Sequence, residues 1–79
     1  MNIKDIKGTR SSIEVELDNK QIIISGELTT TPIFYADIAS IKKWEPPYEN
    51  EIITDTEKNE IIKAIERESK KGKIPVVFD

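Results

Sequence analysis

Residues 11–25 constrain the fold more than any other segment, because their pattern predicts a β-hairpin with a defined register. Apolar and polar side chains alternate over residues 11–17, which suits a strand with one buried face. Asp18 and Asn19 follow, and both residue types tolerate the left-handed backbone of a two-residue turn. The turn pairs Val15 with Ile22, Ile13 with Ile24 and Glu16 with Gln21. Apolar side chains then meet apolar ones across the strands, so the turn and the pattern agree.

The segment after the hairpin predicts further β structure with interruptions. Gly26 is expected to close the second strand or to form a bulge in it. Residues 33–38 are a β-rich run, and Pro32 fits the first position of a strand because it lacks an amide donor. Residues 40–44 either extend this strand or turn away from it. Two prolines then end regular structure, and residues 45–53 are expected to form a partly polyproline-like connection.

Residues 54–71 form the one amphipathic helix that the sequence predicts. A capping box begins it, with Thr54 as the N-cap and Glu57 reaching back to the Thr54 amide. The apolar stripe of this helix consists of Ile61, Ile62, Ala64 and Ile65. Gly72 stands where a left-handed residue would end the helix.

The two ends of the chain add short strands to this pattern. Ile3 and Ile6 favour an N-terminal strand, and residues 74–78 favour a last one, at a sheet edge or starting after Pro75. The expected fold is therefore α+β: a small antiparallel sheet of four to five strands against one helix in the C-terminal half, followed by the last strand. At 79 residues, positions 1–79 are expected to form a single domain.

Composition excludes most kinds of catalytic and metal site. The chain has no cysteine and no histidine, which rules out disulfide scaffolds, zinc fingers, and Cys- or His-based catalysis. No carboxylate spacing resembles a calcium loop, and the serines and threonines lack a histidine base. The sequence therefore predicts no enzyme, no metal site and no cofactor.

Charge and hydropathy indicate a protein that binds neither membranes nor nucleic acids directly. The longest uninterrupted apolar runs are three residues, and residues 1–7 do not resemble a signal peptide, so a cytoplasmic location is expected. The net charge of −3 argues against a nucleic-acid-binding protein, which is usually basic on at least one face.

Residues 44–48, Trp-Glu-Pro-Pro-Tyr, are the first candidate binding segment. Its prolines hold Trp44 and Tyr48 at a low entropic cost, and these two residue types are enriched in interface hot spots. In a domain this small, the alternative that Trp44 plugs one end of a thin core is favoured. For Tyr48 the two alternatives are balanced.

Residues 45–60 are the second candidate, because they carry six acidic side chains and one basic one, a formal charge of −5. This charge would attract a basic partner. Alternatively, the residues form a solvated loop and complement the dipole of the helix, as Asp55 and Glu57 do at its first turn. The predicted partner-binding residues are Trp44, Glu45, Tyr48, Glu49 and Glu51.

The order of these features is similar to a known family. Residues 41–48, Ile-Lys-Lys-Trp-Glu-Pro-Pro-Tyr, followed by the capped helix to Ile65, resemble immunity protein family 74 of bacterial polymorphic toxin systems. The resemblance implies a short α+β protein that protects its own cell by binding a cognate toxin. Its specific part is residues 41–65, and it carries over no toxin-contacting residue.

The predicted function is therefore that of a cytoplasmic immunity protein that neutralises a cognate toxin by direct, stoichiometric binding. A basic toxin such as a nuclease is one candidate partner, and the oligomeric state stays open. One alternative is a small, non-catalytic regulatory or nucleic-acid-associated binding module. The others are a small enzyme, for which no nucleophile–base pair is present, and a structural domain that self-assembles through a strand edge.

Overall fold

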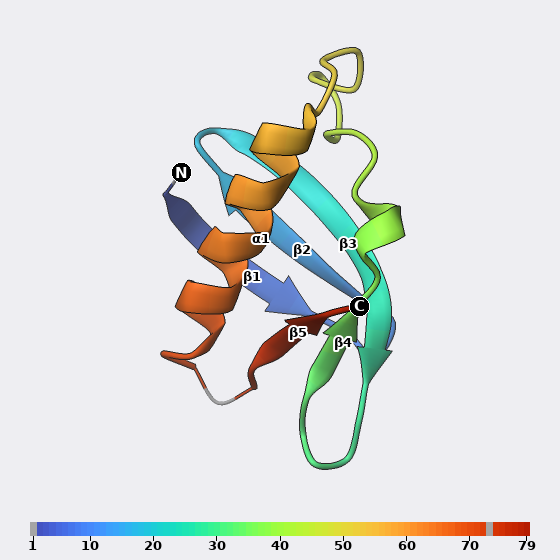
Figure 1. Ribbon diagram of the computed structural model, residues 1–79, viewed down its shortest axis with the longest axis vertical. Coiled ribbons are helices and arrows are strands. Elements are labelled where there is room, and N and C mark those ends of the chain that lie inside the picture. The colour runs from blue at the N-terminus through green and yellow to red at the C-terminus, as the bar shows by residue number, and fades with distance from the viewer. Residues whose placement is uncertain (1, 73) are drawn as a thin grey trace.

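Five strands, a short 3-10 helix and one α-helix make up the computed structural model, which describes residues 2–72 and 74–79 (Figure 1). In chain order these elements are β1 (Ile3–Gly8), β2 (Ser12–Leu17), β3 (Lys20–Leu28), β4 (Phe34–Ala36), η1 (Ile38–Ser40), α1 (Asp55–Ser69) and β5 (Val76–Phe78). The strands form one sheet in the order β1-β2-β3-β4-β5. This arrangement confirms the predicted α+β class, including the N-terminal strand and a last strand that starts after Pro75 at a sheet edge.

The β2–β3 hairpin has the predicted register. Val15 pairs with Ile22, Ile13 with Ile24 and Glu16 with Gln21. Asp18 and Asn19 form the turn with φ angles of 45° and 70°, the left-handed values that a two-residue hairpin turn requires. The alternating apolar side chains of β2 are buried, so the pattern and the turn do fix the same inner face.

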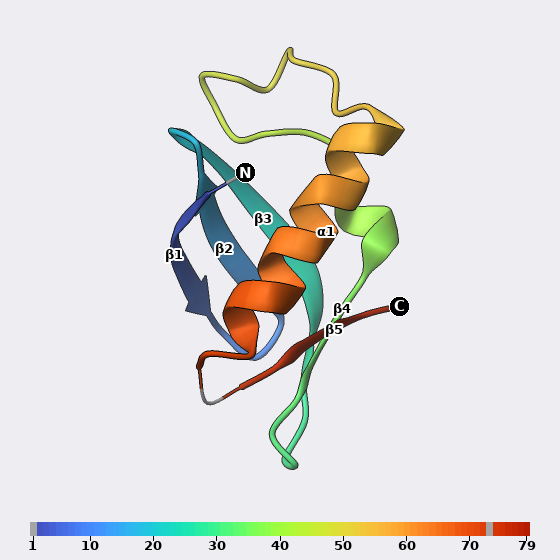
Figure 2. The ribbon, with the colours of Figure 1, turned by 60° about the vertical axis from the view of Figure 1, so that its left-hand side comes forward.

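The helix α1 packs across this inner face of the sheet (Figure 2). It buries Ile61, Ala64 and Ile65, and Ile62 lies at the edge of the core, as the predicted stripe requires. Its N-cap residue is as predicted, since the Thr54 Oγ1 accepts a hydrogen bond from the Glu57 amide at 3.1 Å. The predicted return bond from the Thr54 amide to the Glu57 carboxylate is not formed among the described residues. Each fully buried Ile or Leu side chain contributes about 1.5–3 kcal/mol to folding, so this face holds the domain together.

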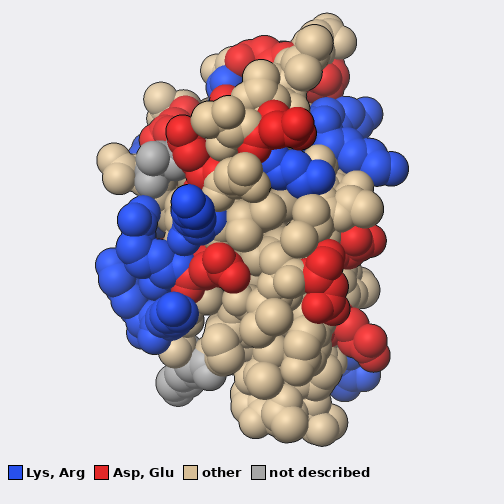
Figure 3. Space-filling view, viewed as in Figure 1, with Lys and Arg blue, Asp and Glu red and all other residues tan. Residues whose placement is uncertain are grey.

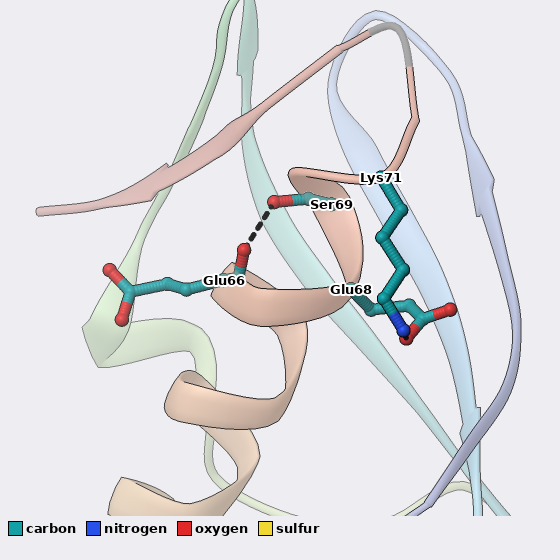
Figure 4. A network of polar contacts seen from close by, with 4 residues as sticks. All are labelled: Glu66, Glu68, Ser69 and Lys71. Carbon is teal, nitrogen blue, oxygen red and sulfur yellow. Dashed lines mark hydrogen bonds and ion pairs between the residues drawn. The ribbon is translucent and has the colours of Figure 1, made fainter.

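The end of α1 differs from the prediction. The helix ends at Ser69 with Lys70 as its cap, and no described glycine has a positive φ. The prediction that a left-handed Gly72 ends the helix is therefore wrong. Instead, the Gly72 amide donates to the Ser69 carbonyl at 3.1 Å, a tighter final turn. The buried Ser69 hydroxyl also donates to the Glu66 carbonyl at 3.0 Å (Figure 4) and accepts from the Val76 amide at 3.1 Å. This serine therefore joins the helix directly to β5.

The sheet is mixed, although the sequence predicts an antiparallel one. β1 to β4 pair antiparallel, but β5 pairs parallel to β4, with Tyr35 opposite Val77. The reason is the connection between these strands. α1 lies within it and returns the chain to the end of the sheet where β4 began, which makes the next strand run parallel.

Gly26 neither ends nor bulges β3, contrary to the prediction. The strand continues to Leu28, and Gly26 pairs with Ala36 with no shift in register. A Cβ atom at this position would collide with the carbonyl oxygen of Tyr35 and lie 2.6 Å from Cε1 of the Phe34 ring. The absence of a side chain here therefore permits the close approach of β4.

The open question about residues 40–44 is answered by a turn after β4. The strand predicted over 33–38 stops at Ala36, where the Asp37 carboxylate accepts a hydrogen bond from the Ala39 amide at 2.9 Å and begins η1. The chain then leaves the sheet and passes above the β2–β3 turn before entering α1 (Figure 2).

Candidate functional site

The candidate site is the connection of residues 45–53, here called the acidic loop, together with the residues that hold it. Its beginning is fixed by Trp44, which is 2% exposed and belongs to the core. The Glu45 amide donates to the Gln21 carbonyl at 2.8 Å, which ties the loop to β3. The burial of Trp44 agrees with its predicted role as a core plug. Its role in partner binding stays a prediction, and from this position Trp44 would act through the loop it holds.

The indole of Trp44 has a polar atom that no other group satisfies. Its Nε1 is buried and has no hydrogen-bond partner among the described residues. A buried donor without a partner costs roughly 1–3 kcal/mol. The apolar contacts of the ring in the core must outweigh this cost, since it is the largest of the fully buried side chains.

Lys20, at the start of β3, holds the other half of the acidic loop. Its Nζ lies 5.3 Å from the ring centroids of both Trp44 and Tyr48, which is within range for cation–π attraction. The same Nζ lies 2.6 Å from Oε1 of Glu51. One lysine thus joins the hairpin, the core tryptophan and two positions of the loop.

The charge of Lys20 is stabilised by this arrangement. The hydrogen bond to Glu51 raises the pKa of Lys20 above its ordinary value of 10.5, while partial burial acts in the opposite direction. Because the pKa is raised in the folded protein, the contribution to stability is complete at neutral pH. It is lost only as the pH rises from 10.5 through the raised pKa.

The acidic loop is a series of turns, and not the partly polyproline-like connection that the sequence predicts. Turns occur at 46–47 and 49–50. The Tyr48 amide donates to the Glu45 carbonyl at 3.1 Å, and the Glu51 amide donates to the Tyr48 carbonyl at 3.0 Å. These local bonds and the contacts of Lys20 give the loop a defined shape.

The structure brings the predicted residues together but gives them different surroundings. Glu49 and Glu51 are exposed, Glu45 is half-buried, and Tyr48 is half-buried against the core. Acidic side chains gather at the top of Figure 3, where some basic ones lie beside them, and further acidic side chains lie along the right of that view. Basic side chains cover the left of that view, over the C-terminal half of α1. On this face, basic side chains are therefore concentrated along one side of the molecule, and acidic ones at its top and along the other side.

Ile52 is the exposed residue that the sequence analysis missed. It is 85% exposed, and it makes an isolated β-bridge with Lys43 that fixes its backbone. The missed signal is the pair Ile52-Ile53 before the helix. Successive side chains of an extended backbone point in opposite directions, so only one of the two can face the core. Ile53 packs against the core, and Ile52 points to solvent.

A cleft lies away from the acidic loop, at the opposite end of the fold. It has a volume of ≈ 730 Å³ and lies between β1 and the C-terminal end of α1, with an apolar floor that includes Ile3, Ile6 and Val76. Glu68 and Lys71 stand at its rim and are paired at 3.4 Å (Figure 4). None of the predicted partner-binding residues lines this cleft.

The acidic loop presents groups that can bind a partner. Within residues 2–72 and 74–79, no group of three or more Asp or Glu side chains is arranged to hold a metal ion. In the same part of the chain, no helix is long and apolar enough to cross a bilayer. The loop presents carboxylates and the apolar side chain of Ile52 on an ordered backbone.

Replacing Lys20 with Met tests whether this lysine shapes the loop. Methionine keeps the apolar stem but removes the charge, so the contacts to Glu51 and Tyr48 are lost. We expect the Glu51 and Tyr48 amides to exchange hydrogen severalfold faster, with little change in the melting temperature. Lys7→Met is the matched control, because Lys7 makes only an exposed pair with Asp5 at 3.9 Å. Equal exchange rates in Lys20→Met and the wild type would contradict this role.

Comparison with known protein families gives a match that covers nearly the whole chain. Neither the curated proteins nor the solved structures contain a significant match to this sequence. The family model described as Immunity protein 74 matches residues 5–79, which include all of the acidic loop and α1. The family that the Trp-Glu-Pro-Pro-Tyr segment and the capped helix resemble is thus matched over almost the entire chain, and the protein belongs to the Immunity protein 74 family.

Proposed function

We propose that this protein neutralises a cognate toxin of a bacterial polymorphic toxin system by direct, one-to-one binding in the cytoplasm. Membership of the Immunity protein 74 family implies a toxin as the partner. The binding residues of this proposal are Glu45, Glu49 and Glu51, on the loop that Trp44 and Tyr48 support. Inhibition is by occupation of the toxin surface, without catalysis.

The observation that supports the acidic loop as the binding surface is its negative charge, presented on an ordered backbone. The loop itself carries three carboxylates and no basic side chain. Together with the first turns of α1, residues 45–60 have a formal charge of −5, while the whole chain has −3. Exposed carboxylates at one end of a small protein steer a basic partner toward that end and raise the association rate. Because Lys20 and the local turns already order the loop, less conformational entropy is lost on binding.

The partner favoured by this surface is a basic toxin, for example one that cleaves nucleic acids and therefore has a cationic substrate site. The acidic loop would then occupy the site where phosphate groups bind. A standard interface needs roughly 800 Å² from each partner, and the 79-residue chain has a total accessible surface of 5379 Å². An interface of this size would therefore cover about 15% of the surface of the chain.

The direct test is co-expression with the toxin encoded in the adjacent reading frame. We expect the chain to rescue cells from that toxin and to form a one-to-one complex with the purified toxin domain. The stoichiometry is measured by calorimetric titration. Cells that die despite soluble expression of both chains would overturn the proposal.

Reversing the charge of Glu49 tests the role of electrostatic steering. Glu49 is exposed and outside the helix, whereas Glu51 is paired with Lys20 and would confound binding with loop structure. We expect Glu49→Lys to slow association several-fold at low salt and to change dissociation much less. The melting temperature should hardly change, since exposed substitutions usually stay within about 0.5 kcal/mol.

The matched control for this experiment is Glu27→Lys. Glu27 is also exposed, but it lies on β3 beyond Gly26, far along the strand from Lys20. It should leave the association rate unchanged. If both variants slow association equally, only the net charge matters and the acidic loop is not the binding surface.

A further inference from the structure

Ile52 stands apart from every other apolar side chain that the structure describes. It is 85% exposed, whereas the next most exposed large apolar residue, Ile23, is 44% exposed. An isolated exposed apolar side chain is common on protein surfaces and has no meaning by itself. The position of Ile52 does carry meaning, because it lies on the acidic loop, next to Glu51 in the chain and across the bridge from Lys43.

The backbone beneath Ile52 is held from three sides. The preceding residue, Glu51, is bonded through its carboxylate to Lys20 and through its amide to the Tyr48 carbonyl. Ile52 itself bridges to Lys43, and the following residue, Ile53, packs against the core. A side chain on such a backbone is already in position for a partner. Little backbone entropy remains to be lost when it becomes buried.

We infer that Ile52 is the apolar anchor of the interface and inserts into an apolar pocket with a basic rim on the toxin. The inference rests on the proposed function and specifies its partner chemistry. Charge complementarity supports it, because three exposed acidic residues, Glu49, Glu51 and Asp55, lie within three positions of Ile52 in the chain and outnumber the exposed Lys43 across the bridge. An interface commonly has a few buried anchor residues surrounded by polar contacts that exclude water. Here Ile52 is the anchor, and the carboxylates form the surrounding polar contacts.

The two kinds of group should act on different steps of binding. Exposed charges act during the encounter and therefore on the association rate. A buried apolar side chain contributes only once the complex has formed, so its loss is expressed mainly in the dissociation rate. This separation distinguishes an anchor from a loop that binds by charge alone.

The test uses Ile52→Ala with the toxin domain encoded in the adjacent reading frame, made catalytically inactive. We expect the affinity to fall roughly ten- to hundredfold, mostly through faster dissociation, as for the loss of a fully buried isoleucine side chain. Ile52→Val should give a smaller loss in the same step. Ile23→Ala is the matched control, because Ile23 is exposed on β3 and should bind as the wild type does.

A second variant separates an apolar pocket from simple charge attraction. Ile52→Glu adds a carboxylate to an already acidic loop. We expect it to bind more weakly than Ile52→Ala, because a carboxylate buried in an apolar pocket is strongly unfavourable. The inference that Ile52 is an apolar anchor would be overturned by either of two results. One is tighter binding by Ile52→Glu, and the other is an unchanged dissociation rate in Ile52→Ala while the wild type binds. If the wild-type chain does not bind this toxin at all, the proposed function itself has failed.

Discussion

Trp44→Ala should lower the free energy of unfolding by about 3–5 kcal/mol, the range for removing a large aromatic side chain from a core. Trp44 is 2% exposed and is the largest fully buried side chain. Small domains are stable by only about 5–15 kcal/mol, so this loss would unfold a large fraction of the molecules at 37 °C. Denaturant unfolding followed by circular dichroism measures the effect.

Trp44→Phe is the informative companion variant. Phenylalanine keeps much of the buried volume and removes the Nε1–H group, which is buried without a partner. Eliminating an unsatisfied donor recovers part of the energy lost with the smaller ring. We therefore expect a clearly smaller loss than for alanine. Indole emission from the wild type at the wavelength found in water, or normal stability of Trp44→Ala, would contradict the burial of this residue.

Gly26→Ala should also lower the free energy of unfolding, although it adds only one methyl group. The new Cβ would collide with the backbone carbonyl of Tyr35 and lie 2.6 Å from the Phe34 ring. Main-chain atoms of a paired strand cannot move aside without breaking the β3–β4 ladder. Overpacking of this kind costs about 1–3 kcal/mol, and sometimes more. The loss is measured as a lower midpoint of denaturation.

Gly8→Ala is the matched control for this effect. Its Cβ would make an ordinary contact of 3.6 Å with Cγ2 of Ile13, and the φ of Gly8 is not positive. Alanine therefore fits without strain, and reduced freedom of the unfolded chain should leave the stability equal or slightly higher, by up to about 1 kcal/mol. Equal losses in both variants would mean that the close approach of β4 at Gly26 is not the cause.

The two substitutions should differ in their effect on toxin binding. Trp44 begins the acidic loop and forms one of the rings under Lys20, so its loss would release the backbone that presents Ile52. Gly26 acts at the other end of β3, away from the loop. At temperatures where both variants are still folded, Trp44→Ala should weaken toxin binding, and Gly26→Ala should not.

Local patterns in the sequence were sufficient to predict the β2–β3 hairpin and the helix α1. The register of β2 and β3 depends on side-chain alternation and on a two-residue turn, and both lie within a few residues of each other. The N-cap at Thr54 and the buried face of α1 likewise depend only on neighbours three or four residues apart. The acidic character of the loop is a matter of composition, and it required no knowledge of the fold.

Contacts between distant segments decided the remaining features, and no local pattern encodes them. The direction of β5 follows from where α1 returns the chain, and the need for glycine at position 26 follows from the backbone of β4. In the sequence, Lys20 is an ordinary strand residue. Only the fold places Trp44, Tyr48 and Glu51 around its Nζ atom. The sequence by itself determined the hairpin, the helix and the charge of this protein. Only the packing of α1 and the loop on the sheet decided that Ile52 is exposed and that Trp44 takes the core position favoured for it, because burial depends on all the segments that surround a side chain.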